Sequence, residues 1–375
     1  MTAGSGDAIA AFAPEARVQW PWMFSKKFDI LFYFAPIAIG IFCFALSQYA
    51  FANQNKLWLF LAVNAFGAGP FHWGPTWFTY LDRKNRGHYA STWSTRAIFY
   101  LGPPAIILFC AFGWLHFKLL IYAFSMIWTI QHVVQQNVGI LLLYHNHGQN
   151  EAIADKRLEI HSQWAPSILF SLIFIQRIFL SQQPTLLMIP IVLCGLWAIY
   201  AVFTYLTALK KQCAQGKYLN MPAMLFWLSS ILSLVPFAFI GRGFEDAFII
   251  PVAIHWFQYI GLNFMLVKVK YGADESDNLM DLPADKPLTL YFLACAVFLT
   301  ITLLIAIAAS TIKDQLWLAI LGGIGVGLGN THYFLDAFLW RFRGSHQRET
   351  ILPYLNRPRR QLREATKLQA MDTAS

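Results

Sequence analysis

Four histidines lie inside long apolar stretches of this chain, where an ionisable side chain is costly to bury in a membrane and marks a candidate functional site. They are His72, His132, His255 and His332. Neutral imidazole is a common ligand of late first-row metal ions, and iron is preferred where oxygen chemistry takes place. If the four stretches converge, the sequence predicts a shared metal site, with iron(II) as the ion and haem as the alternative.

Polar residues accompany the histidines at helical spacing. Asp336 lies one turn after His332, Gln135 lies one turn after His132, and Tyr259 lies one turn after His255. A metal-bound imidazole needs a hydrogen-bond partner on its second nitrogen, which such side chains supply. We therefore expect Asp336 to support His332 rather than to bind the metal. The candidates for a catalytic role are Asp336, Gln135 and Tyr259.

Other interpretations stand beside the metal site. Each histidine could bridge two helices by hydrogen bonds or line a transport path, and the chain would then be a non-enzymatic transporter, anchor or assembly subunit. His255 is also shallower: a rise of 1.5 Å per residue places it roughly 13 Å below the outer surface, against roughly 21 to 24 Å for the other three. His145 is an alternative fourth ligand, although a surface polar residue is the plainer interpretation.

Composition indicates the class of protein in which these residues lie. Hydrophobic residues make up 57% of the 375 positions and charged residues only 13%, about half the charged share of a soluble domain. The mean hydropathy is +0.47. These values predict an integral membrane protein in contact with the lipid bilayer, and the net charge of +9 is then no argument for nucleic-acid binding.

The apolar stretches predict an all-α, polytopic transmembrane helical bundle of about ten spans. All four histidines fall on even-numbered spans. Glycine and proline interrupt the second span over residues 67–75, which predicts a kinked or broken helix beside His72. The expected spans are Ile30–Tyr49, Leu57–Tyr80, Ala97–Trp114, Leu119–Tyr144, Ala165–Leu180, Thr185–Leu206, Pro222–Ile240, Ala247–Val269, Leu288–Ala309 and Leu316–Phe342.

The last span is rich in glycine before His332. Gly322, Gly323, Gly325, Gly327 and Gly329 leave a surface without side chains, which a second helix or a flat ligand could approach closely.

Basic residues predict the orientation. They concentrate in the connections after the even-numbered spans and in the C-terminal tail, and they are sparse in the other connections. This pattern places both termini in the cytoplasm, in the inner membrane of a bacterium. Residues 1–27 are then a cytoplasmic or interfacial leader, residues 28–343 a single membrane domain, and residues 344–375 a basic amphipathic tail.

The arrangement of intramembrane histidines, with an acid after the last one, resembles the Brp/Blh group of membrane beta-carotene central-cleavage dioxygenases. This resemblance implies a helical membrane fold, a non-haem iron(II) held by four histidines, and dioxygen and a long polyene as substrates. Carried over to this chain, the ligands would be His72, His132, His255 and His332, with Asp336 as support. The chain lacks a compact His-Gly-x-x-Asp element, because Trp73 and Gly74 follow His72 and the next acid is Asp82. The expected function is that of a membrane oxidoreductase acting on a lipophilic, carotenoid- or lipid-like substrate.

The orientation gives a first prediction. A reporter fused after Ser375 should remain in the cytoplasm, because the basic tail resists translocation. Green fluorescent protein at this position should therefore fluoresce, and alkaline phosphatase, which is active only outside the cytoplasm, should be inactive. A C-terminal reporter accessible from outside the cell would contradict the predicted topology.

Overall fold

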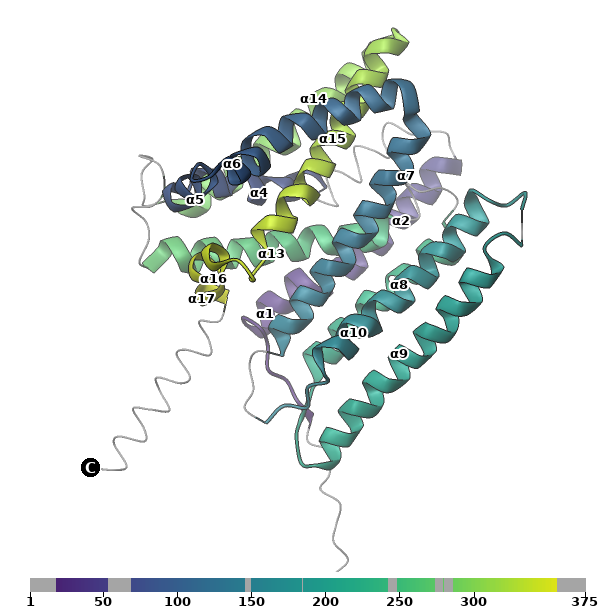
Figure 1. Ribbon diagram of the computed structural model, residues 1–375, viewed down its shortest axis with the longest axis vertical. Coiled ribbons are helices and arrows are strands. Elements are labelled where there is room, and N and C mark those ends of the chain that lie inside the picture. Colours follow the sequence, from purple (N-terminus) through teal and green to yellow (C-terminus); the bar gives the residue numbers. More distant parts are fainter. Residues whose placement is uncertain are drawn as a thin grey trace, which may run out of the picture.

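The computed structural model describes residues 18–52, 69–145, 150–183, 185–241, 248–273, 279 and 286–355, and it is built almost entirely of helices (Figure 1). The longer helices are α2 (Pro36–Ala52), α7 (Gly102–Tyr144), α8 (Lys156–Ile178), α9 (Met188–Ala214), α10 (Met221–Leu232), α13 (Ile249–Ala273), α14 (Pro287–Thr311) and α15 (Gln315–Leu339). The shorter ones are α1 (Lys26–Asp29), η1 (Ile30–Phe34), η2 (Pro70–Trp73), α4 (Gly74–Phe78), η3 (Thr79–Leu81), α5 (Arg83–Tyr89), α6 (Trp93–Arg96), η4 (Ala97–Leu101), α11 (Leu234–Phe239), α16 (Ser345–Thr350) and α17 (Leu352–Leu355).

Eight helical segments in the described residues are long and apolar enough to cross a membrane. This agrees with the expected all-α fold, whereas the number of ten spans is not reproduced. One of the eight segments, Trp93–Tyr144, covers both the third and the fourth expected spans and bends at Phe117, whose backbone is non-helical (φ −136°, ψ 42°). Large apolar side chains such as Ile189, Leu196 and Phe203 of α9 are exposed, as a lipid-facing surface requires.

The second expected span is a broken helix in the part that the structure describes. Residues 69–81 form the 3₁₀-helix η2, the short helix α4 and the 3₁₀-helix η3 in place of one continuous α-helix. Pro70 and Pro75 each stand in the first turn of their helix, where the missing N–H of proline has no carbonyl partner to lose. The first part of this span, residues 57–68, lies outside the described residues.

Part of the glycine-rich stretch of α15 packs against the first half of α7, whereas a Cβ atom on Gly325 would meet no described atom within 4 Å. A Cβ atom on Gly323 would lie 2.5 Å from the Cα atom of Ala111, and one on Gly327 would lie 2.8 Å from the Cα atom of Ile107. Glycine is therefore required at both positions for the two backbones to approach this closely. A similar contact joins Gly74 of α4 to the backbone of Cys295 in α14.

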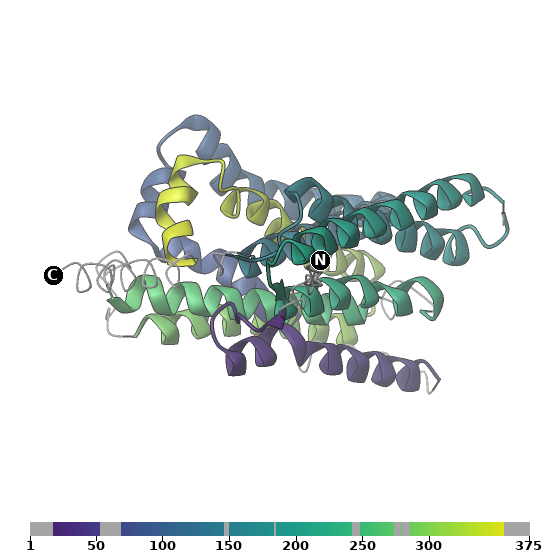
Figure 2. The same ribbon diagram turned by 90° about the horizontal axis from the view of Figure 1, so that it is seen from below.

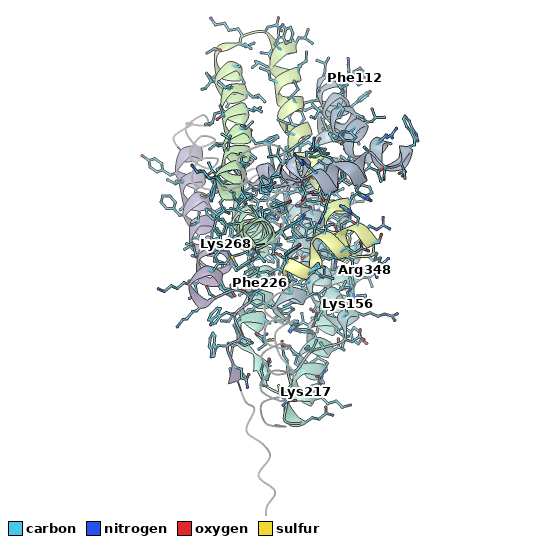
Figure 3. The ribbon with its side chains drawn as sticks, turned by 90° about the vertical axis from the view of Figure 1, so that its left-hand side faces the viewer. Phe112, Lys156, Lys217, Phe226, Lys268 and Arg348 are labelled. Atoms are coloured by element: carbon cyan, nitrogen blue, oxygen red, sulfur yellow. The ribbon has the colours of Figure 1, made fainter. Side chains whose placement is uncertain are left out.

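Helix α13 lies across the direction of α8 and α9 in Figure 1 and is seen nearly end-on beside Lys268 in Figure 3, where α14 and α15 stand upright. It packs against α2, the purple helix along one side of the molecule in Figure 2. The ring of His255 lies 5.2 Å from that of His72 and 4.8 Å from that of His132, centroid to centroid, so the expected difference in depth between His255 and the other histidines is not reproduced.

The segments flanking the membrane domain are tied to it in the described residues. Val18–Gln19 (β1) pairs in parallel with Leu219–Asn220 (β2), which follows α9. After α15, the short helices α16 and α17 bury Gln347 and Leu355. Residues 1–17 of the expected leader and the basic segment after residue 355 lie outside the described residues.

A buried ion pair joins the end of the broken span to the end of α13. Lys270 Nζ lies 2.7 Å from Asp82 Oδ2, and the Tyr271 hydroxyl donates to the same oxygen at 2.5 Å. Burial alone would raise the pKa of Asp82, but the Lys270 ammonium and these hydrogen bonds hold the pKa of the carboxyl below its ordinary value. A carboxyl with a depressed folded-state pKa contributes stability above its unfolded pKa, about 3.9, and loses it as the pH falls through the folded-state pKa.

We therefore expect Asp82→Asn to reduce the free energy of unfolding by about 3–5 kcal/mol, because the buried Lys270 ammonium loses its carboxylate. Thermal melting of the detergent-solubilised protein measures the loss. The double variant Asp82→Asn/Lys270→Met should recover much of it, since no charge is then left behind. A single variant as stable as the wild type would show that the pair does not hold these segments together.

Candidate metal centre

The four histidines meet in the interior although they come from four separate segments. His72 lies on η2, His132 on the second half of α7, His255 on α13 and His332 on α15, and each is at most 8% exposed. The ring centroid of His72 lies 4.7 Å from that of His332 and 5.2 Å from that of His255. The centroid of His132 lies 4.8 Å from that of His255 and 5.0 Å from that of His332. Four imidazoles therefore share one buried volume.

The nitrogens of this cluster have the properties of ligand atoms. Among the described residues, the Nε2 atoms of all four histidines are buried and have no hydrogen-bond partner, and neither has Nδ1 of His255. One ligand atom from each of His72, His255 and His332 lies within 4.8 Å of the others. Metal–nitrogen bonds of about 2.1 Å allow ligand atoms to lie up to about 4 Å apart, so a small inward movement would let these groups bind one ion. The donor set fits a late first-row metal.

In two of the histidines, a hydrogen bond engages Nδ1 and leaves Nε2 free. Nδ1 of His72 is bonded to the carbonyl oxygen of Gly69, and Nδ1 of His332 lies 2.7 Å from the hydroxyl oxygen of Thr76. A carbonyl oxygen can only accept, so Nδ1 of His72 carries the proton and Nε2 keeps its lone pair. His332 has the same tautomer if its Nδ1–H donates a hydrogen bond to the Thr76 hydroxyl oxygen, while the Thr76 hydroxyl donates its own hydrogen bond to Asp336.

Asp336 supports His332 through an intermediate residue. Its Oδ1 atom lies 3.7 Å from Nδ1 of His332, too far for a hydrogen bond. The Thr76 hydroxyl lies between them and donates to Asp336 Oδ1 at 3.0 Å, and the Tyr259 hydroxyl donates to the same oxygen at 2.8 Å. Asp336 therefore contacts His332 through the Thr76 hydroxyl and not by the direct hydrogen bond that the sequence suggested.

Thr76 is the member of this network that the sequence analysis missed. A threonine in an apolar stretch carries no chemical signal of its own. Its position four residues after His72 was nevertheless informative, because such a residue faces the same side of a helix.

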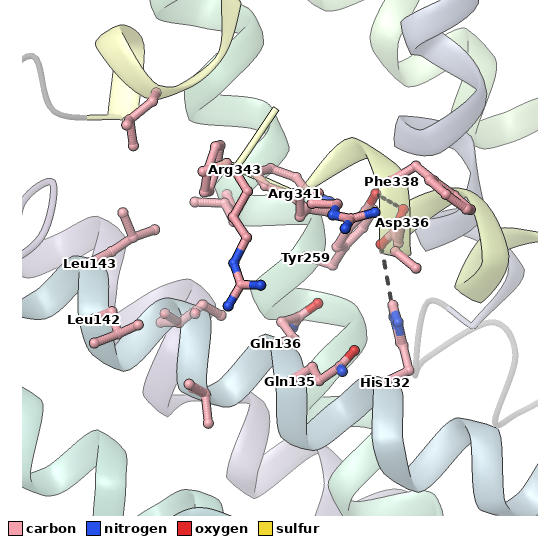
Figure 4. Close-up of a pocket in the computed structure, with 18 of the residues that line it drawn as sticks. His132, Gln135, Gln136, Leu142, Leu143, Tyr259, Asp336, Phe338, Arg341 and Arg343 are labelled. Carbon is pink, nitrogen blue, oxygen red and sulfur yellow. Dashed lines mark hydrogen bonds and ion pairs between the residues drawn. The ribbon is translucent and has the colours of Figure 1, made fainter. Parts of the chain in front are cut away.

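The second carboxylate oxygen of Asp336 is itself a potential ligand. Oδ2 has no hydrogen-bond partner among the described residues and lies 3.8 Å from Nε2 of His132, the contact that Figure 4 marks with a dashed line. His132, His332 and Asp336 form a second group whose ligand atoms lie within 4.8 Å of one another. Two histidines and one carboxylate are the ligand set of many non-haem iron oxygenases. Asp336 is thus placed either to support His332 or to bind the metal directly.

A cavity of about 820 Å³ reaches the cluster from one end of the molecule, and His132, Tyr259 and Asp336 line it (Figure 4). Gln135 lines the same cavity but is exposed and makes no described hydrogen bond to a histidine. Its neighbour Gln136 is the residue that contacts the cluster, donating to the backbone oxygen of His255 at 3.1 Å. Gln135 therefore lies near the candidate metal centre, beside the route to it.

His145 belongs to a different cluster. Its Nδ1 atom lies 2.5 Å from Glu151 Oε1 and its Nε2 atom 3.3 Å from Glu159 Oε1, and all three side chains are buried. The interpretation of His145 as a surface polar residue is therefore wrong, because two carboxylates pack over the end of α7. Its position 13 residues after His132, roughly 20 Å along α7, also places it away from the four central histidines.

The chain matches no protein-family model, no curated protein and no solved structure.

Thr76→Val tests the network, since valine keeps the shape of threonine and removes the hydroxyl. We expect metal retention to weaken by about 10- to 100-fold, the usual loss when the partner of a metal-bound histidine is removed. Asp336→Asn should weaken it to a similar degree. The measurement is the metal remaining per monodisperse protein after dialysis against a graded chelator.

Thr302→Val is the matched control, because Thr302 is also buried but its hydroxyl bonds only to a carbonyl of its own helix, that of Phe298. It should retain the wild-type metal content. Equal retention in Thr76→Val and the wild type would show that the hydroxyl does not orient His332.

Proposed function

We propose that the protein is an integral membrane oxidoreductase that uses histidine-bound non-haem iron(II) and dioxygen on a lipophilic, carotenoid- or lipid-like substrate. The observation that carries the proposal is the convergence of four buried imidazoles with unpartnered Nε2 atoms. Iron(II) bound there would supply the activation of dioxygen. The proposal includes an inner-membrane location in a bacterium with both termini in the cytoplasm, as the charge pattern predicts.

The residues of the chain have distinct roles in this proposal. His72, His132, His255 and His332 would hold the ion, and the Gly69 carbonyl and Thr76 would keep two of the rings in the tautomer that presents Nε2. Asp336 and Tyr259 connect Thr76 to the cavity wall, so a proton at Nδ1 of His332 has a hydrogen-bonded route toward the substrate space.

The cluster is largely shielded from bulk solvent. The four histidine residues are at most 8% exposed, and the Trp256 ring stacks over that of His72 with 5.6 Å between centroids. A shielded site suits oxygen chemistry because it protects reactive species from water and strengthens the electrostatic effect of fixed groups. Apolar side chains dominate the cavity wall, including Leu142, Leu143 and Phe338, which favours an apolar substrate body.

Two alternative uses of the histidines fit the geometry less well. Histidines that bridge helices would hydrogen-bond to one another or to facing side chains, but these Nε2 atoms do neither among the described residues. A haem would need room for its macrocycle between two axial rings. The widest described pair, His255 and His332, has ring centroids 6.3 Å apart. The centroids of His72 and His132 lie 4.7–5.2 Å from both of these rings, in the space that the macrocycle would occupy. A bare ion fits this spacing better.

The proposal predicts that purified protein carries close to one equivalent of iron and shows no Soret band. His332→Ala should lose the metal, because His332 belongs to both groups of candidate ligands. His116→Ala is the matched control, since His116 is an exposed histidine of α7 whose described ring contacts are with Phe112 and Phe117. Elemental analysis and absorption spectra of both variants, with dioxygen uptake in the presence of a polyene, measure these outcomes. Wild-type metal content in His332→Ala would contradict the proposal, and a Soret band would indicate haem instead.

A further inference from the structure

The cavity that reaches the candidate metal centre has an uneven distribution of charge. Its inner end contains the single carboxylate among its described lining residues, that of Asp336. Three cationic side chains also line it: Lys156 at the start of α8, and Arg341 and Arg343 just after α15. Cationic groups thus outnumber carboxyl groups among the described lining residues.

Arg341 and Arg343 are available to bind an anionic ligand. Both are exposed, and neither forms an ion pair within the described part of the chain, where the ion-pair partners of Asp336 are His132 and His332. In Figure 4 the side chain of Arg343 extends across the cavity toward the helix that carries Gln136, and Arg341 lies on the side of Asp336. Arginine presents several N–H donors in a planar fork, which suits carboxylate and phosphate groups.

The cavity is long enough for an extended molecule. The cavity follows α7 from His132 to Leu143, which corresponds to roughly 16 Å at the helical rise of 1.5 Å per residue. Its walls between these residues are mainly aliphatic and aromatic, and its volume of about 820 Å³ lies within the range of sites for small molecules, about 300–1,000 Å³.

We infer that the substrate is a single-chain amphiphile with an anionic head group, which binds at Arg341 and Arg343 while its apolar chain extends to the histidine cluster. The inference rests on the proposed function for the chemistry at the cluster, but the binding of the anion stands on the cavity alone. Arginines near a membrane surface also contact anionic phospholipid head groups. Both arginines line a cavity that leads to buried histidines. This position favours a ligand that enters the cavity, as opposed to a lipid that remains in the bilayer.

The test uses cis-parinaric acid, a fluorescent conjugated fatty acid, and its uncharged methyl ester. Binding to the full chain in nanodiscs of phosphatidylcholine is followed by energy transfer from tryptophan, and Trp340 lines the cavity. The acid should bind more tightly than the ester. In Arg341→Gln/Arg343→Gln the affinity for the acid should fall by about tenfold or more, as the loss of charge-assisted hydrogen bonds implies, and the affinity for the ester should not change.

Arg157→Gln is the matched control, because Arg157 is an exposed arginine beside Lys156 that does not line the cavity. It should leave both affinities unchanged. The inference would be overturned by equal binding of acid and ester, by absence of binding, or by an equal effect of the control variant. It would also be overturned if phosphatidylglycerol in the nanodiscs displaced the acid completely, which would assign the arginines to lipid head groups.

The metal content separates this inference from the proposed function. Arg341→Gln/Arg343→Gln should retain wild-type iron, since neither arginine is among the candidate ligands. Wild-type protein that binds the acid but holds no iron would contradict the proposed function and leave the anionic ligand supported. Protein that holds iron but does not distinguish the acid from the ester would contradict only the present inference.

Discussion

A buried nitrogen without a hydrogen-bond partner is unfavourable by about 1–3 kcal/mol, and the interior of this protein brings together several of them in one small volume. Water cannot satisfy them in a membrane interior as it would at a soluble surface. The rest of the site holds this arrangement in place: the Gly69 carbonyl and Thr76 fix two rings, and the Asp336 network fixes Thr76. The proposed cation, once bound, would satisfy the unpartnered Nε2 atoms together.

Close helix packing provides the rigidity that such a site needs. Gly323 and Gly327 hold α15 against α7, and Gly74 holds the broken segment against α14. The result is that the segments bearing His72 and His332 are each fixed by a close backbone contact with a neighbouring helix. A ligand set displaced by about 1 Å loses much of its function, so glycines that determine helix spacing contribute to the site without touching it.

The sequence allowed the helical membrane fold and the members of the histidine cluster to be predicted, because histidines in apolar stretches are rare and conspicuous. It did not reveal Thr76, since a hydroxyl residue in an apolar stretch is usually bonded to its own helix, as Thr302 is. The sequence suggested that His255 is shallower than the other three, whereas its ring lies among theirs, because the level at which helices meet is set by tertiary packing and not by local sequence. The burial of His145 was missed for a similar reason: its contacts with Glu151 and Glu159 are made by the tertiary structure and leave no pattern in the local sequence.

The order of synthesis imposes a delay on this site. Thr76 and His332 are 256 positions apart, so at about 5–20 residues per second the ribosome needs on the order of 10 to 50 s to supply the second after the first. During that time the earlier segments enter the bilayer with their polar side chains incompletely matched. The cluster is complete only when α15, the last long helix in the described residues, has been inserted, so the proposed metal could bind all of its ligands only after that step. A chain that ends before α15 would present isolated histidines to the lipid and to the proteases that remove unfinished membrane proteins.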